Sequence, residues 1–598
     1  MPDLARLQAW QRLWSNRLSE RADGLAAQLH RLGADEHTLL LGFALVIGVA
    51  VGLAVIVFYK LIDVVQAGSL TAVSRVTGFG SVVILLITVA GLGLTRVLVR
   101  YGTRDSEGEN IPDVMRAVAK RGGLLRLGPV MVKTVASALA IGTGGSVGAE
   151  GPVAVAGSAL GSKIGRLFRS SPERLRLLVA CGAAAGISAA FNAPIAGVFF
   201  SLEKVVGGFG VRAFPPILVA SVIAAAISRA AFGASPVIEI PTEYGMGAPS
   251  ELILYALLGI ATGVVSVFYT RTAYRAQDLL GRIRSVWLQV LAGAIVVGAF
   301  NVLFKADLWG RGHETLSIEM IGQRAGYFLV ALALTKVLVT AATLAVARAG
   351  GVFTPALFVG ATLGGGLATM LKSVAPGLQI APEAFALVGM AGLVAGSAHA
   401  PLTAIMIVFE MTSDYALILP LMLCGAVAYI TARRLHPESI YSEWLTRRGI
   451  NIHLGRDAAV MERLRVGDVY NRNPQIIGEA ATVPQIVDAI RDSNQIEFPV
   501  LDVELRLLGM ISYSDLRTVL TDSEQFAEVI VAADVASPHF ERVTPEDSLA
   551  TALQRLGMRG SHDIPVVDTT DEERLLGVIG RQEILTAYDR ELLRERSE

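Results

Sequence analysis

Cysteine is nearly absent from this sequence: only Cys181 and Cys424 occur among 598 residues, and both lie in apolar segments. So small a set excludes a disulfide framework and a CxxC metal site. Charge is also scarce, since charged residues make up 17% of the chain, whereas soluble proteins average about 25%. The formal net charge is zero, which gives no argument for nucleic acid as a partner. No short apolar core with a small-residue cleavage site marks the N-terminus, so we expect no signal peptide.

Apolar residues are correspondingly abundant, at 53% of the chain with a mean hydropathy of +0.54. Apolar runs dominate from Leu39 to about Thr431, and charged residues recur every few positions from Glu438 onwards. This shift predicts a membrane body, embedded in a lipid bilayer, followed by one compact soluble domain. We therefore divide the chain into a leader at 1–37, a membrane domain at 38–448, a linker at 449–460 and a soluble region at 461–598.

The distribution of basic residues predicts the orientation of the membrane body, because Lys and Arg are retained on the cytoplasmic side. The leader is rich in arginine, and so are the loops at Arg166–Arg176 and Arg271–Arg284. In contrast, no Lys or Arg lies between Arg229 and Arg271, a span that holds three glutamates. We expect a multi-pass protein of the inner (plasma) membrane, with its N-terminus, its basic loops and its C-terminal domain in the cytoplasm.

The membrane body contains an internal repeat. In both "FNAPIAGVFFSLE" at 191–203 and "AHAPLTAIMIVFE" at 398–410, a Glu follows the proline of Ala-Pro by nine residues. Upstream, two sets of residues match in spacing: Lys133, Pro152, Gly157 and Gly161 in one half, and Lys336, Pro355, Gly360 and Gly364 in the other. Matching interrupted segments in two halves are typical of transporters whose binding site lies where broken helices meet. We place the two repeats at about 38–235 and 250–448.

Three Gly- and Pro-containing segments predict helix starts inside the membrane: "GENIP" at 108–112, "GAEGP" at 148–152 and "GGVFTP" at 350–355. Proline is favoured in the first helical turn, where the backbone N–H groups are unpaired. In hydrocarbon such groups are costly unless they face protein, water or a ligand. Helix starts that converge would form an anion site from backbone donors and helix dipoles. Since Lys and Arg are scarce in these segments, we expect weak binding of a compact inorganic anion.

Glu150 is the carboxylate at the second of these helix starts. Its side chain can compete with an anion for the same N–H groups, and it can swing away when it is protonated or displaced. A purely structural helix cap is the alternative interpretation. Ionisable residues inside a membrane are functional by default, so we favour a gate.

Four segments resemble, in order and separation, those of the CLC chloride channel and transporter family: "GTGGSVGAEGPVAVAG", "AAFNAPIAGVFFSLE", "AGGVFTPALFVGATLG" and "LVGMAGLVAGSAHAPLTAIMIVFEMTSDYALILPLML". The resemblance covers about 39–448 and implies a mostly α-helical membrane protein, a CLC-type inverted-repeat bundle with broken helices. It further implies a homodimer with one chloride pathway per subunit, with Glu150 as the gating glutamate and the Tyr441 hydroxyl closing the inner end. By the same resemblance, the anion is bound by backbone groups at Glu109, Asn110, Ile111, Gly151, Val352, Phe353 and Thr354.

Three positions depart from the family's usual pattern. The first motif commonly reads Gly-Ser-Gly-Ile-Pro, but Glu109 and Asn110 stand in place of the serine and the second glycine. A charged Glu109 would repel an anion, so it is protonated, turned aside or a second acid–base group. Ala149 replaces a basic residue that often precedes the gate. Lys204 stands where the antiporters commonly carry their inner proton-transfer glutamate, and a lysine cannot replace it in the same relay at neutral pH.

The soluble region contains a second internal repeat, seen in "EFPVLDVELRLLGMIS" at 497–512 and "DIPVVDTTDEERLLGVIG" at 563–580. It resembles a cytoplasmic α/β CBS-domain pair, with one domain at 461–525 and the other at 526–598. CBS pairs often bind adenine nucleotides such as ATP, ADP or AMP, and their ribose-binding signature is met by Ser512 and Asp515. The second copy has Gly580 and Glu583 there, a weaker match. A purely structural dimerisation module is an equal alternative.

We therefore expect chloride transport that is channel-like or weakly coupled to protons, gated by Glu150 and modulated by the CBS domains. One alternative is a proton-coupled chloride antiporter, with Glu109 or Glu203 in the proton route. Another is a membrane-anchored nucleotide sensor that does not conduct. No nucleophile–base or metal constellation emerges, so we expect neither enzyme activity nor a required cofactor or metal. The loss of the central serine leaves selectivity among chloride, nitrate and fluoride open.

Overall fold

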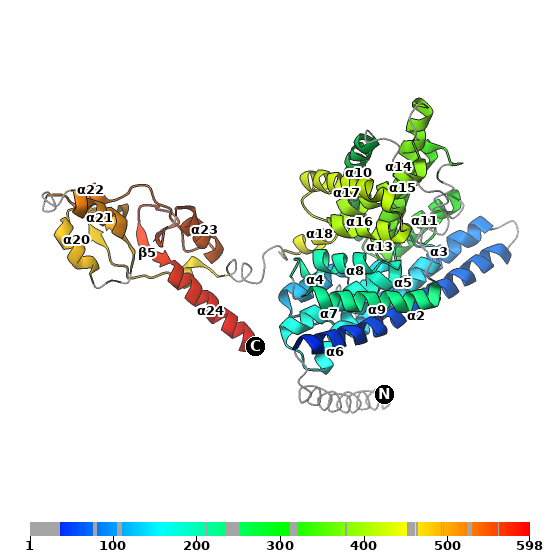
Figure 1. Ribbon diagram of the computed structural model, residues 1–598, viewed down its shortest axis with the longest axis horizontal. Coiled ribbons are helices and arrows are strands. Elements are labelled where there is room, and N and C mark those ends of the chain that lie inside the picture. Colours follow the sequence, from blue (N-terminus) through cyan, green and yellow to red (C-terminus); the bar gives the residue numbers. More distant parts are fainter. Residues whose placement is uncertain are drawn as a thin grey trace. The chain divides into compact units, whose positions relative to one another are not determined.

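The chain divides into two compact units, Met1–Ile450 and Asn451–Glu598, in the computed structural model shown in Figure 1. The structure describes residues 36–75, 80–103, 110–210, 213–233, 251–304, 307–310, 321, 323–376, 380–450, 461, 464–491, 493, 495–522, 529–559 and 561–597. Glu109, nearly all of the leader and residues 451–460 of the linker lie outside these ranges.

Helices build the first unit, and nine helices of its described part are long and apolar enough to span a bilayer. They are α2 (Glu36–Arg75), α3 (Gly80–Gly102), α7 (Pro172–Phe191), α9 (Phe214–Phe232), α10 (Glu251–Gly281), α11 (Val286–Leu303), α13 (Gly326–Ala347), α14 (Phe353–Val374) and α17 (Ile418–Leu435, preceded by the 3-10 turn Tyr415–Leu417). The others are α4 (Ile111–Lys120), α5 (Leu127–Gly142), α6 (Glu150–Leu167), α8 (Pro194–Phe200), the π-helical turn η1 (Ser201–Val206), α15 (Pro382–Ala398), α16 (Pro401–Thr412) and α18 (Ser442–Thr446). The mostly helical membrane fold is thereby confirmed.

The matched glycines of the two repeats make matched helix contacts. In the first half α6 packs against α7, and a Cβ on Gly157 would lie 2.1 Å from the carbonyl oxygen of Gly182. In the second half α14 packs against α15, and a Cβ on Gly360 would lie 2.3 Å from the carbonyl oxygen of Gly389. Only glycine permits so close an approach of two helix backbones. The repeat seen in the sequence is therefore a repeat of packing as well.

Each Ala-Pro motif begins a short helix after a sharp break. The C-cap residues of α7 and α15, Asn192 and His399, have φ angles of 54° and 53°, and Asn and His are among the residue types enriched in this left-handed conformation. Pro194 and Pro401 then start α8 and α16, where the missing N–H costs nothing. α7 and α9 also pack against each other and against α2 (Figure 1).

The glutamates of these motifs cap each other's helices across the two repeats. Glu203, in η1, accepts hydrogen bonds from the backbone N–H groups of Leu402 and Thr403 at the start of α16, at 3.1 and 2.9 Å. Glu410, in α16, accepts from the N–H groups of Ile195 and Ala196 at the start of α8, at 3.0 and 2.7 Å. A carboxylate at a helix start satisfies unpaired N–H groups and the helix dipole. The Glu of each motif thus caps the short helix that begins at the Pro of the other motif.

Short strands and amphipathic helices build the second unit. β1 (Ile477–Gly478) pairs in parallel with β2 (Glu497–Leu501), β2 pairs antiparallel with β3 (Leu507–Ser512), and β4 (Asp563–Val567) pairs antiparallel with β5 (Leu575–Gly580). The helices are α20 (Val483–Ile490), α21 (Tyr513–Asp522), α22 (Ala532–Val535), α23 (Leu549–Arg559) and α24 (Arg581–Ser597), several of which are labelled in Figure 1. Four of the five residues of β2 and of β4 are buried, which explains their apolar sequences.

In this unit, the segment that precedes each half of the sequence repeat pairs with a strand of the other half. Asn471, at the start of the first half, forms a two-way backbone pair with Val578 of β5. Ser537, at the start of the second half, pairs in the same way with Met510 of β3. Val466 accordingly lies in the apolar core around β4 and β5. The two cores therefore do not coincide with the two halves of the sequence.

Candidate functional site

Two helix starts, those of α6 and α14, lie side by side in the centre of the first unit. A pair of backbone hydrogen bonds, each 2.8 Å long, joins Gly148 to Gly351 directly before these helices. Gly350 has a φ of +97°, a conformation that glycine adopts without strain, and its N–H donates to the Ser137 hydroxyl of α5 at 2.9 Å. Both helix N-termini consequently face the same region.

Glu150 of α6 reaches across to the start of α14. One oxygen of its carboxylate, Oε1, accepts from the backbone N–H of Phe353 at 2.6 Å. The other, Oε2, accepts from the Thr354 hydroxyl at 2.7 Å. All three residues are buried, with Glu150 only 1% exposed. The carboxylate therefore takes the donors that a small anion at this helix start would need.

Thr354 contributes a side chain that the sequence interpretation did not foresee. Only the backbone group of Thr354 was expected at the site, but its hydroxyl is the second donor to Glu150. The sequence signal for this role was a Thr directly before a proline at a helix start. The proline has no N–H to donate, and the Thr hydroxyl can bind a neighbouring anion in its place.

Two tyrosines border the site. Tyr269 of α10 donates its hydroxyl proton to the Val352 carbonyl at 2.8 Å, which fixes the backbone just before α14. The Tyr441 hydroxyl is buried and has no hydrogen-bond partner among the described residues. A buried phenol without a protein partner offers a donor to a ligand.

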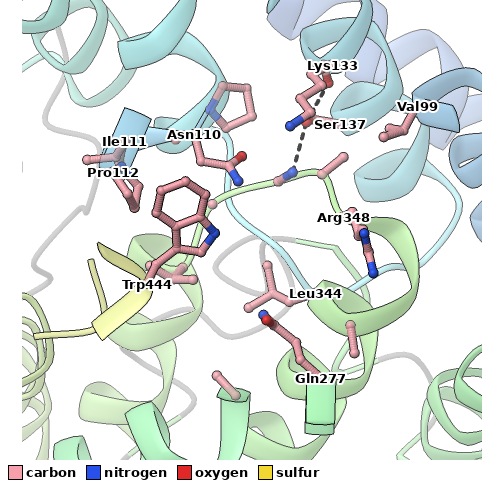
Figure 2. Close-up of a pocket in the computed structure, with 18 of the residues that line it drawn as sticks. Val99, Asn110, Ile111, Pro112, Lys133, Ser137, Gln277, Leu344, Arg348 and Trp444 are labelled. Atoms are coloured by element: carbon pink, nitrogen blue, oxygen red, sulfur yellow. Dashed lines mark hydrogen bonds between the residues drawn. The ribbon is translucent and has the colours of Figure 1, made fainter. Parts of the chain in front are cut away.

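A cavity of about 370 Å³ adjoins these groups, and Figure 2 shows its lining. The predicted site residues Asn110, Ile111, Gly151, Val352 and Tyr441 all line it. Asn110 and Ile111 come from the start of α4, where the Asp113 carboxylate accepts from the Asn110 N–H at 3.1 Å. The structure thus brings the described members of the predicted set together, around or next to one cavity.

Among the described residues that line this cavity, basic side chains outnumber carboxylates. Its basic lining residues are Arg96, Lys133, Arg348 and Arg448. Its one carboxylate among the described residues is Asp278, which is paired with Arg447 at 3.0 Å.

Lys204 lies in η1, buried, with Glu203 as its sequence neighbour. The Glu203 carboxylate is already engaged in this arrangement, because it caps the start of α16. The hydroxyl of Thr403 donates to the same carboxylate. An alternative proton route through Glu203 would therefore require breaking the contact between the repeats.

Ser512 and Asp515 lie together at the start of α21, but they bind each other. The Asp515 carboxylate accepts from the Ser512 N–H at 2.9 Å and from its hydroxyl at 2.6 Å. In the second half, Glu583 accepts from the Gly580 N–H at 3.1 Å in the same position. Both carboxylates therefore act as helix caps, and only the first half adds a hydroxyl.

Comparison with known proteins finds two families in the chain. The family described as voltage gated chloride channel matches residues 91–433. The CBS domain matches residues 466–522 and 531–590.

Individual relatives and solved structures match about two thirds of the chain or more. The chain is 34% identical over 419 residues to a putative chloride channel protein ClcB-like of Ralstonia nicotianae, covering 68% of this chain and 97% of the relative. It is 30% identical over 438 residues to the H(+)/Cl(-) exchange transporter ClcA of Salmonella schwarzengrund, covering 70% and 91%. Among solved structures, a slow cyanobacterial Cl−/H+ antiporter matches with a TM-score of 0.62 and 26% identity, over 69% of this chain and 98% of that one. A eukaryotic CLC transporter of 20% identity has the same fold, with a TM-score of 0.61 over 92% and 99%.

Proposed function

The chain belongs to the voltage gated chloride channel (CLC) family, and from this premise we propose that it carries chloride across a membrane with Glu150 as the gate. The observation that carries the proposal is the position of the Glu150 carboxylate on the Phe353 N–H and the Thr354 hydroxyl. With the side chain in this place the donors are taken, so the pathway is closed. When it leaves, the same donors and the helix dipole of α14 stabilise chloride.

Transport is channel-like or only weakly coupled to protons. Buried Lys204 cannot pass a proton as a carboxylate does while it is charged, and neighbouring Glu203 is engaged with α16. A strictly coupled H+/Cl− antiporter is the second candidate. It is favoured by the resemblance to the Salmonella exchange transporter and to the cyanobacterial antiporter.

Paired flux measurements in proteoliposomes distinguish these candidates. The purified chain is reconstituted, a chloride gradient is imposed, and chloride and protons are measured together. We expect chloride efflux with little or no proton movement. Uphill proton movement in a fixed ratio to chloride would establish the antiporter instead.

The gate is tested separately with Glu150→Gln, which mimics the protonated side chain. Chloride efflux of the wild-type chain should vary with pH, and the variant should lose this dependence. A variant with an unchanged pH profile would assign proton sensing to another group, and Glu109 is the next candidate.

The remaining parts of the proposal concern assembly and regulation. The chain acts as a homodimer in the inner (plasma) membrane, with the N-terminus and CBS domains in the cytoplasm, and it performs transport rather than catalysis. The CBS pair modulates conduction by binding an adenine nucleotide near Ser512 and Asp515. Isothermal titration of the full-length protein with ATP, ADP and AMP tests this, with Asp515→Asn as the variant expected to lose affinity.

A further inference from the structure

A second group of buried polar side chains surrounds the turn that leads to the gate. Gly144 lies six residues before Glu150, in the segment between α5 and α6, and its φ is +99°. A Cβ on Gly144 would lie 3.0 Å from Thr88 Oγ1, 3.1 Å from Asn301 Nδ2 and 3.1 Å from ring carbon Cε3 of Trp309. Three side chains from α3, α11 and the segment 307–310 therefore converge on one backbone turn.

Each of these side chains has a buried polar atom that forms no hydrogen bond within the described part of the chain. Thr88 Oγ1, Asn301 Oδ1 and Trp309 Nε1 have no hydrogen bond among the described residues. Thr88 and Asn301 are 0% exposed and Trp309 is 5% exposed. An unpaired polar atom in such surroundings costs about 1–3 kcal/mol, so three of them on side chains that meet at a single turn indicate a ligand.

The position of these groups is held by bonds that the protein does make. The amide Nδ2 of Asn301 donates to the Gly144 carbonyl at 2.9 Å, which leaves Oδ1 as a bare acceptor. The ammonium of Lys336 donates to the carbonyls of Leu308 and Gly310 at 2.9 and 3.2 Å, on either side of Trp309. Lys336, conspicuous in the sequence as the counterpart of Lys133, thus orders the segment that carries the tryptophan.

Thr88 differs from another threonine of the same helix. The hydroxyl of Thr95 donates to the Gly91 carbonyl of α3 at 2.8 Å, the usual bond for a buried helical threonine. Thr88 makes no such bond, so its hydroxyl is available to the cluster.

The chemistry of the three atoms identifies the ligand. Trp309 Nε1 is only a donor, Asn301 Oδ1 is only an acceptor, and the Thr88 hydroxyl is both. An anion would be repelled by the amide oxygen and a cation by the indole N–H. Water can donate and accept, and a buried water typically makes about three hydrogen bonds.

We propose that ordered water binds between Thr88, Asn301 and Trp309 and braces the turn at Gly144 that carries the gate. Ser146, two residues further on, is tied to α13 through Thr340 at 2.8 Å and Thr343 at 3.2 Å. The bound water supports the turn in addition to these Ser146 contacts, so that the Glu150 side chain reaches the start of α14 in one orientation. The bracing role rests on the proposed gate, whereas the water site itself does not.

The water site is tested by an experimental structure of the full-length protein at a resolution that shows ordered water. We expect density within hydrogen-bonding distance of Thr88 Oγ1, Asn301 Oδ1 and Trp309 Nε1. A second data set with bromide in place of chloride should show no halide signal there. The proposal is overturned if the position contains no density or if it contains bromide.

The bracing role is tested by chloride efflux with a matched pair of variants, Thr88→Val and Thr95→Val. Loss of one bridging hydrogen bond should raise efflux by about threefold to tenfold in Thr88→Val. A less rigid turn at Gly144 would hold the Glu150 side chain less firmly in its closed position. Thr95→Val should have little effect, and Thr88→Ser should behave as wild type. Equal effects of both valine variants, or an effect of Thr88→Val that persists in a Glu150→Ala background, would refute the bracing role.

Failures of the two proposals are distinguishable. If Glu150→Gln leaves the pH profile of efflux unchanged, proton sensing belongs to another group, and the density still decides the water site. If Thr88→Val does not fold, the wild-type density still decides the water site.

Discussion

The Thr354 hydroxyl offers the sharpest test of the gate. Among the described residues, it is the one side-chain group that donates a hydrogen bond to the Glu150 carboxylate. Replacing Thr354 with Val removes the donor to Oε2 at 2.7 Å and keeps the β-branched shape of the side chain. The Phe353 N–H still donates to Oε1 at 2.6 Å. The closed position of the gate should therefore be weakened but not lost.

The size of the effect follows from the burial and charge of the partners. Glu150 is 1% exposed and Thr354 is 4% exposed, so water does not replace the lost bond easily. A hydrogen bond to a charged group contributes about 1.5–3 kcal/mol, and about 1.4 kcal/mol corresponds to a tenfold change in an equilibrium. Occupancy of the closed position should fall by about tenfold to a hundredfold relative to the open one. Chloride efflux should rise by up to that factor, until another step limits it.

The assay is chloride efflux from proteoliposomes at equal protein density, with Thr362→Val as the control. Thr362 is also buried in α14, but its hydroxyl donates to the Phe358 carbonyl of its own helix at 2.8 Å. Thr354→Ser should restore wild-type efflux. Unchanged or slower efflux in Thr354→Val, or an equal increase in Thr362→Val, would contradict the role of the Thr354 hydroxyl in holding the gate closed. An increase that remains when Glu150 is replaced by Ala would contradict it too.

Three further predictions concern the scaffold. Gly360→Ala should destabilise the protein by about 1–3 kcal/mol, because its Cβ would lie 2.3 Å from a carbonyl oxygen of α15. The control Gly93→Ala should be neutral or stabilising, because a Cβ at Gly93 would have no atom within 4 Å. Thermal unfolding in detergent measures both variants. Glu410→Gln should lower thermal stability by about 1–3 kcal/mol, since an amide is a poorer cap for α8 than a carboxylate, and a variant as stable as wild type would contradict the reciprocal capping. Burial, with the nearby Asp563 carboxylate, raises the pKa of Glu497 at the start of β2. Protonation therefore favours the folded state, and the stability that it contributes is present at acidic pH and lost as the pH rises through the raised pKa. Hydrogen exchange in β2 should accordingly be slower in Glu497→Gln than in wild type at neutral pH and similar at acidic pH, and the opposite order would contradict this assignment.

Local features of the chain predicted much of the membrane fold. Gly and Pro mark the starts of α6 and α14 because their effects on the backbone depend on the residue itself and not on distant partners. The spacing of Gly157 and Gly360 after their prolines places each glycine on the face that meets the neighbouring helix. Such patterns repeat in the sequence because the packing repeats.

Contacts between distant segments could not be predicted from local features of the sequence. The sequence indicated that Glu203 and Glu410 are equivalent, but not that each caps the helix of the other repeat, about 200 residues away along the chain. In the soluble unit, the repeat predicted two halves in sequence, whereas the preceding segments exchange between the two cores.

The amino-acid sequence alone indicates a membrane protein with a repeated, broken-helix body, a carboxylate at one helix start and a paired C-terminal module. These are properties of composition, spacing and local backbone preference. The tertiary structure decided what the carboxylate touches: the Phe353 N–H and the Thr354 hydroxyl, on a helix of the other repeat. It also gathered Thr88, Asn301 and Trp309 around Gly144. Both sites depend on side chains from separate helices meeting at one point, and only the packing of those helices brings them there.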